Sequence, residues 1–203
     1  MHIPDGFLDI KTSLITNLIS AIFIFISIKK INTNLNPQRI PLMGISSTFV
    51  FTIQLLSFPV FSGTSVHLLG SVLVAVLLGP FCGFLVVSCS LILHSLFFQH
   101  GGVLTLGANI LNIAVVGCFL GYLIYKIYPT NISAAFSAFL TTMIGAFLCS
   151  VELFLSNKSP IKQTLIAMSS FHIIGGIIEA VVTFLILNLI YKVKPEIKEL
   201  EKI

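Results

Sequence analysis

Long apolar stretches alternate along the chain with short breaks rich in glycine, proline and polar residues. No Asp, Glu, Lys or Arg occurs in residues 12–28 or anywhere in residues 40–125. A transmembrane helix takes roughly 20 apolar residues, so the second stretch must hold several spans joined by very short turns. The pattern therefore predicts an all-α polytopic membrane protein, with one domain covering residues 1–203.

Glycine and proline breaks divide the long uncharged stretch at residues 58–66, at Gly79-Pro80 and at His100-Gly101-Gly102. A short segment, residues 1–9, precedes the first apolar stretch. The third predicted span is short for a full crossing, and a re-entrant segment is the alternative there. The breaks predict a bundle of about seven transmembrane helices, at residues 12–28, 41–58, 66–79, 81–99, 103–125, 131–153 and 164–191.

The distribution of Lys and Arg favours seven spans, because these residues collect on the cytoplasmic side of membrane proteins. With seven spans and the N-terminus outside, only Lys11, Lys158 and Lys162 of the 11 basic residues lie outside. Removing the third span would place Lys126 on the opposite side from Lys29. We therefore expect the N-terminus outside and the C-terminus in the cytoplasm.

Composition agrees with a membrane protein: 56% of the residues are hydrophobic, 9% are charged and the mean hydropathy is +1.07. The formal charge of +4 follows largely from the cytoplasmic lysines, so it indicates contact with anionic membrane lipid rather than with nucleic acid. No basic region precedes the first apolar stretch, and we expect the N-terminus to be retained. The four cysteines form no C-x-x-C pair, which favours buried apolar side chains.

The first two residues, Met1 and His2, can act together as a chelator. The amine of Met1 and the amide nitrogen of His2 close a five-membered ring on a metal ion. The same amide closes a six-membered ring with Nδ1 of His2, so three nitrogens lie in one plane. A fourth nitrogen, most simply from an imidazole, would complete a square-planar set that suits Ni(II) or Cu(II) better than Zn, Mg or Ca.

His67 is the candidate for that fourth nitrogen. Pro4-Asp5-Gly6 is typical of a tight turn that would fold the N-terminus back toward the bundle. On the predicted topology His67 follows a loop on the same outer face. The alternative is a histidine that lies at the membrane interface without binding metal.

Five motifs are spread over nearly the whole chain: Met1-His-Ile-Pro-Asp-Gly-Phe-Leu8, Phe58-Pro-Val-Phe-Ser-Gly-Thr-Ser-Val-His-Leu-Leu-Gly70, Leu78-Gly-Pro80, Gly107-Ala-Asn-Ile-Leu-Asn112 and His172-Ile-Ile-Gly-Gly-Ile-Ile-Glu179. They resemble the CbiM/NikM family, the substrate-binding components of nickel and cobalt energy-coupling-factor transporters. The first two motifs together are highly specific.

The resemblance implies a seven-helix bundle that carries the N-terminus into a central cavity of a protein in the prokaryotic cell membrane. It implies that the Met1 amine, the His2 amide and imidazole, and the His67 imidazole bind transported Ni²⁺ or Co²⁺, with no separate cofactor. The implied partners are a transmembrane coupling protein, cytoplasmic ATP-binding subunits and often a small additional membrane subunit. Cobalt supply to cobalamin biosynthesis is one expected use.

The stretch from His94 to Gly102 departs from the family's pattern, which usually reads something like Gln-Ala-Leu-Leu-Phe-Gly-Asp-Gly-Gly. Two additional histidines, His94 and His100, therefore lie at the ends of the fourth predicted span. They would serve as ligands on the path into the site or as support for it, or else as hydrogen-bonded histidines at the interface. The departure leaves the choice between nickel and cobalt open.

Polar residues in and near the predicted spans complete the candidate set. Glu179 is the only acid well inside a predicted span, and His172 lies two helical turns before it on the same face. We expect a structural or coupling role for Glu179, with metal ligation as the alternative. Asn109 and Asn112 would hydrogen-bond the ligand loop or a neighbouring helix. The remaining candidates for support around the metal are Asp5 and Ser65.

The chain contains no Gly-x-x-x-x-Gly-Lys-Ser/Thr motif, so we expect no P-loop ATP site and no enzymatic activity of its own. Energy for import would come from separate ATPase subunits. A self-sufficient secondary permease for a divalent ion is the alternative, although such proteins usually carry more intramembrane acids than one. A metallopeptidase is disfavoured because no His-Glu-x-x-His is present.

Overall fold

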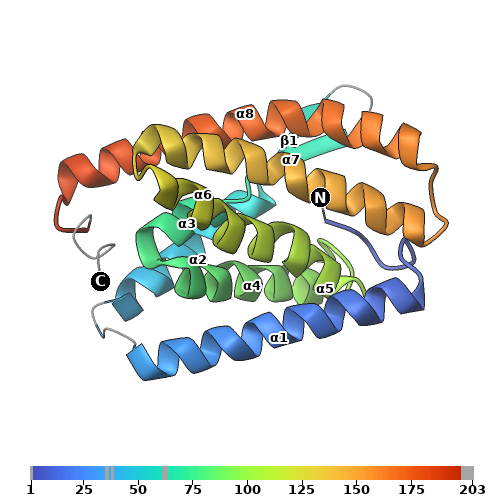
Figure 1. Cartoon of the computed structure of the whole chain (residues 1–203), viewed down its shortest axis with the longest axis horizontal. Coiled ribbons are helices and arrows are strands. Elements are labelled where there is room, and N and C mark those ends of the chain that lie inside the picture. Colours follow the sequence, from blue (N-terminus) through green and yellow to red (C-terminus); the bar gives the residue numbers. More distant parts are fainter. Residues whose placement is uncertain (1, 35–36, 38, 61–63, 198–203) are drawn as a thin grey trace.

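The computed structural model describes residues 2–34, 37, 39–60 and 64–197 as a helical bundle with one β-hairpin. In Figure 1, α1 lies along one side of the bundle and the α7–α8 pair along the opposite side, with α3, α4 and α6 between them. The elements are α1 (Ile10–Asn34), α2 (Arg39–Leu55), β1 (Ser57–Val60), β2 (Thr64–His67), α3 (Ser71–Leu78), α4 (Pro80–Phe97), α5 (Leu106–Asn109), the π-helix η2 (Ile110–Leu120), α6 (Gly121–Ile127), α7 (Asn131–Leu155) and α8 (Ile161–Val193).

The all-α prediction is confirmed, with the hairpin as an addition. Within the described part of the chain, five helical stretches are long and apolar enough to cross a membrane: Ile10–Asn32, Pro80–Phe97, Leu106–Ile127, Asn131–Leu155 and Ile161–Val193. The third of them is continuous through α5, η2 and α6. These stretches coincide with five of the seven spans predicted from the sequence.

The other two predicted spans have different bounds in the structure. In the segment predicted at 41–58, the helix α2 ends at Leu55 and the chain continues into β1. This strand pairs antiparallel with β2, and Ser57 lies opposite His67. The one at 66–79 contains only the eight-residue helix α3, about 12 Å long at 1.5 Å per residue. Alone it cannot cross a hydrocarbon core of roughly 30 Å.

The helix α3 lies in the middle of the bundle, and all eight of its residues are buried. All of its residues after Ser71 are apolar, as expected for a helix that is buried on every side. Its fit against α4 is close: a Cβ on Gly83 would come within 2.8 Å of the Ala75 backbone. The core around it draws side chains from most of the helical elements, including Val72, Phe84, Ile113 and Leu187.

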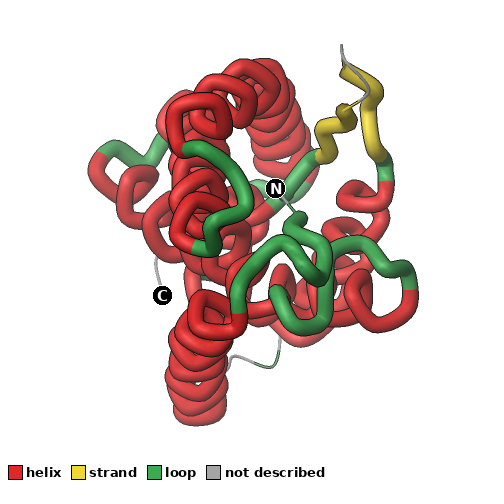
Figure 2. Tube along the Cα trace, turned by 90° about the vertical axis from the view of Figure 1, so that its right-hand side faces the viewer, coloured by secondary structure: helices red, strands yellow, loops and turns green. Residues whose placement is uncertain are grey.

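One end of this bundle brings the N-terminal segment to its centre. Seen end-on in Figure 2, the N-terminal end lies near the middle of the bundle and the two strands stand at the rim. Ile3 is 2% exposed and packs with Leu8, Ala108 and Cys149. His2 and His67, two of the residues that the sequence singled out for metal binding, meet at this end of the bundle.

Candidate metal site

Three histidines from separate parts of the chain converge at this end of the bundle. Nδ1 of His2 lies 2.8 Å from Nε2 of His67 and 3.1 Å from Nε2 of His100. The three potential ligand nitrogens lie within 4.8 Å of one another, and all three residues are partly buried. Nitrogens about 2.0–2.1 Å from one metal ion lie roughly 3 Å apart at right angles, so the two short separations fit neighbouring coordination positions.

The hydrogen bonding of His67 leaves the nitrogen that faces His2 available for metal. Its Nδ1 lies 3.1 Å from the carbonyl oxygen of Leu68. Since a carbonyl can only accept, Nδ1 donates and carries the ring hydrogen in the neutral imidazole. Nε2 then presents a lone pair toward His2, which is the tautomer that a metal ligand needs.

The backbone of Ile3 anchors the N-terminal segment to the loop before α5 and to the helix that follows. Its N–H donates to Oδ1 of Asn109 at 2.7 Å, and its carbonyl accepts from Nδ2 of Asn109 at 3.1 Å. The same carbonyl accepts from the hydroxyl of Thr105 at 2.6 Å and from the backbone N–H of Gly102 at 2.9 Å. These bonds fix the peptide groups before and after Ile3, the residue next to His2.

Asp5 ties the predicted turn to the same loop. Its carboxylate accepts the backbone N–H groups of Val103, Leu104 and Thr105 at 3.1, 2.9 and 3.3 Å. Gly102 must be a glycine for this approach, because a Cβ there would collide with Asp5. Asp5 therefore supports the N-terminal segment rather than reaching the three imidazoles.

Glu179 of α8 holds the chain just after His67. Its two carboxylate oxygens accept the backbone N–H groups of Leu69 and Gly70 at 2.8 and 2.7 Å. Gly70 adopts a left-handed conformation with φ of 69°, directly before α3. The carboxylate thus satisfies two buried amides at the start of that helix and fixes the loop that carries His67.

Residues 2–197 match the CbiM family model, which is described as "Cobalt uptake substrate-specific transmembrane region". The chain belongs to the CbiM family. It is therefore a component of a metal transport system, and its long apolar helices make it a multi-pass protein of a prokaryotic cell membrane. The sequence resemblance to CbiM/NikM proteins is confirmed.

Relatives of this CbiM family member carry names that refer to both metals. A putative fused nickel transport protein NikMN of Archaeoglobus fulgidus is 34% identical over 98% of this chain and 68% of its own length. A cobalt transport protein CbiM of Acetoanaerobium sticklandii is 32% identical over 97% of this chain and 86% of its own length. The crystal structure of a truncated transition metal transporter has a TM-score of 0.87 at 30% identity, covering 95% of this chain and 99% of that chain.

In this CbiM protein the ring of His94 lies near the three converging histidines without joining them. It is fully buried, its Nε2 lies 3.1 Å from the carbonyl oxygen of Phe51, and its ring centroid is 6.2 Å from that of His2. The sequence grouped His94 with His100 as one departure from the family's pattern. The structure separates them, since only His100 reaches the imidazole of His2.

Two further predicted residues make hydrogen bonds to partners other than the ligand loop. Asn112 donates to the carboxylate of Glu152 at 2.6 Å, rather than to the ligand loop. Glu152 is a buried acid that the sequence did not single out, because it stands near the end of a predicted span. The Nδ1 of His172 lies 2.8 Å from the carbonyl oxygen of Met168, within its own helix.

Two predicted positions lie outside the described residues: Met1, and the side chain of Ser65.

Burial keeps the converging histidines of the CbiM site neutral. It lowers the pKa of His2 well below the usual value of 6.5, and the neighbouring His67 adds to that effect. Burial likewise lowers the pKa of His100. Neutral imidazoles have free lone pairs, which is the form that binds metal.

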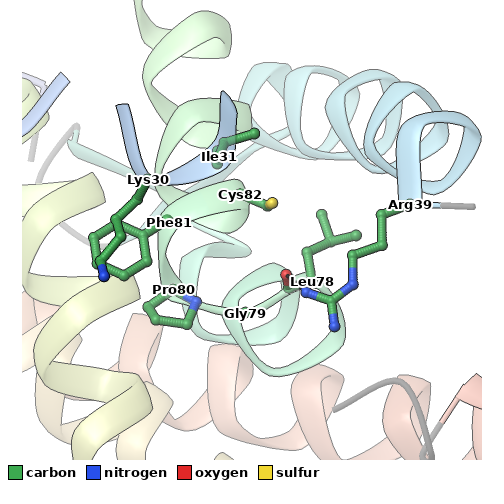
Figure 3. Close-up of a pocket in the computed structure, with 8 residues that line it drawn as sticks. All are labelled: Lys30, Ile31, Arg39, Leu78, Gly79, Pro80, Phe81 and Cys82. Carbon is green, nitrogen blue, oxygen red and sulfur yellow. Dashed lines mark hydrogen bonds between the residues drawn. The ribbon is translucent and has the colours of Figure 1, made fainter. Parts of the chain in front are cut away.

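A separate cavity of about 250 Å³ lies at the other end of α1, where Lys30 and Arg39 contribute to its wall (Figure 3). Arg39 donates from Nη1 to the carbonyl oxygen of Leu78 at the end of α3, 3.3 Å away. Among the described residues that line this cavity, Cys82 is the one possible transition-metal ligand, so no cluster of ligands forms there.

Proposed function

We propose that this CbiM family member is the high-affinity Ni²⁺- or Co²⁺-binding subunit of an energy-coupling-factor importer. In this proposal the Met1 amine, the His2 amide and Nδ1, and the His67 Nε2 form a planar set of four nitrogens. The observation that carries it is the 2.8 Å separation between Nδ1 of His2 and Nε2 of His67, which are 65 residues apart in the chain. That separation suits neighbouring corners of a square-planar complex.

The surrounding contacts support a preformed site. Ile3 is bonded on both sides, and Glu179 holds the backbone next to His67. A donor set that is held in place before the metal arrives loses little conformational entropy on binding, which raises affinity.

Import needs energy from elsewhere, because the chain has no P-loop motif. We assign that role to cytoplasmic ATP-binding subunits acting through a transmembrane coupling protein. Two relatives are named as fused nickel transport proteins, NikMN and LarMN, and these names favour an additional small N component. The membrane arrangement in this proposal has seven segments, the N-terminus outside and the C-terminus in the cytoplasm.

Titration calorimetry of the purified chain with NiCl₂ and CoCl₂ tests the chelate. His2→Ala and His67→Ala should abolish high-affinity binding, whereas His94→Gln should retain it. Unchanged affinity in His2→Ala, or mass spectrometry showing a trimmed or blocked Met1, would overturn the chelate.

A secondary permease is the competing function. Metal uptake by vesicles that contain only the purified chain and no ATP would favour it. Uptake that requires the ATPase subunits and ATP would favour the importer.

A further inference from the structure

His100 lies where a fifth ligand to the same metal would lie. Its Nε2 is 3.1 Å from Nδ1 of His2, close to the 2.8 Å that separates Nδ1 of His2 from Nε2 of His67. The planar set proposed above already fills its four corners with nitrogens. A fifth nitrogen 3.1 Å from Nδ1 of His2 can then reach the metal only from above or below that plane.

The turn after α4 presents His100 in a fixed position. Gln99 and Gly101, on either side of it, both adopt left-handed conformations, with φ of 53° and 89°. The backbone N–H of His100 donates to the carbonyl oxygen of His94 at 3.2 Å. The left-handed conformation is uncommon for a residue other than glycine, so its occurrence at Gln99 indicates a constrained turn.

The same turn is joined to the N-terminal segment. Gly102 donates from its backbone N–H to the carbonyl oxygen of Ile3 at 2.9 Å. A Cβ on Gly101 would lie 2.9 Å from Nδ2 of Asn109 and 3.3 Å from the His2 ring. His100 is therefore held against His2 by the backbone on both sides of it, and its position does not depend on a flexible loop.

We propose that His100 is an axial metal ligand that makes the site five-coordinate and moves its preference from nickel toward cobalt. The inference rests on the planar set of the proposed function. Four strong nitrogen donors in a plane favour diamagnetic four-coordinate Ni(II), whereas an axial imidazole gives a five-coordinate paramagnetic ion. Co(II) accepts the fifth ligand readily, so losing it should weaken cobalt binding more than nickel binding.

The ring planes agree with an imidazole that approaches from a direction different from the other two. The His100 ring is inclined by 73° to the His2 ring and by 77° to the His67 ring, while the His2 and His67 rings are inclined by only 47°. Ring centroids of His2 and His100 are 4.2 Å apart. No other histidine in the described part of the chain joins this group of three.

The test compares the wild-type chain with His100→Ala and His100→Gln, each loaded separately with Ni²⁺ and Co²⁺. X-ray absorption and magnetic susceptibility should show a five-coordinate paramagnetic nickel complex in the wild type and a four-coordinate diamagnetic one in both variants. Nickel affinity should change little, while cobalt affinity should fall about 10- to 100-fold. Retained nickel binding shows that the variants are folded.

His94→Gln is the matched control, because it removes a neighbouring imidazole that does not reach His2. It should keep the wild-type spectrum. Identical spectra and an identical nickel-to-cobalt ratio in wild type and His100→Ala would overturn the axial ligand, while loss of metal in His2→Ala would still uphold the proposed function. Failure of the wild-type chain to bind either ion would overturn both.

Discussion

The carboxylate of Glu179 on α8 accepts the backbone N–H of Gly70 at 2.7 Å, and so it connects the last long helix to the loop that carries His67. The other carboxylate oxygen accepts the next N–H toward His67, that of Leu69. One side chain thus fixes the direction in which the ligand loop enters the bundle. From this relationship we propose that Glu179 positions the ligand loop.

Glu179→Gln should weaken nickel and cobalt binding about 10- to 100-fold, a loss typical of groups that orient metal ligands. The amide of Gln has one accepting oxygen, so one of the two buried N–H groups loses its partner. Titration calorimetry measures the loss. Glu152→Gln is the control, because Glu152 is also buried but bonds Asn112 instead of the ligand loop. Equal affinities in the two variants would refute the positioning role.

Gly101→Ala should both destabilise the protein and weaken metal binding. The left-handed conformation costs a residue with a side chain about 1–3 kcal/mol, and the new methyl group would press on the His2 ring. Gly44→Ala in α2 is the control, since a Cβ there meets nothing within 4 Å. Thermal unfolding in detergent, followed by metal titration, compares the Gly101→Ala and Gly44→Ala variants. A Gly101→Ala protein as stable as Gly44→Ala would contradict the strained turn.

Asp5→Ala should loosen the N-terminal segment and lower metal affinity. A hydrogen bond to a charged acceptor contributes about 1.5–3 kcal/mol to stability, and this variant loses such bonds. Asp9→Ala provides the comparison. Asp9 accepts the backbone N–H of Thr12 at the start of α1 and makes no contact with the loop before α5. Metal titration should separate the two variants. If Asp9→Ala lost as much affinity as Asp5→Ala, general destabilisation would explain the effect.

The proposed membrane orientation predicts which positions a membrane-impermeant thiol reagent reaches from outside the cell. Cys89 is the exposed natural cysteine and Cys82, Cys118 and Cys149 are buried, so Cys89→Ser gives a suitable background. In it, Lys158→Cys should be labelled in intact cells, because Lys158 follows α7 on the predicted outer side. Lys194→Cys should be labelled only after permeabilisation. Labelling of both in intact cells would rule out the proposed orientation.

The sequence predicted the helical class and most of the helices because both follow from local patterns. Uncharged apolar stretches identify helices long enough to cross a bilayer, and Gly79-Pro80 separates α3 from α4 in the structure as expected. The pairing of His2 with His67 was also predicted. The chemistry of an N-terminal chelate that lacks one planar ligand called for a further imidazole, and the predicted topology together with the family resemblance pointed to His67.

Contacts between distant segments were decided only by the tertiary structure. The sequence could not show that Glu179 would bond the amides after His67, or that His100 would lie 3.1 Å from His2 while His94 would not reach it. It also predicted a longer third helix than the eight residues of α3. Apolar composition alone does not distinguish a lipid-facing span from a short helix enclosed by others, because both surroundings exclude water.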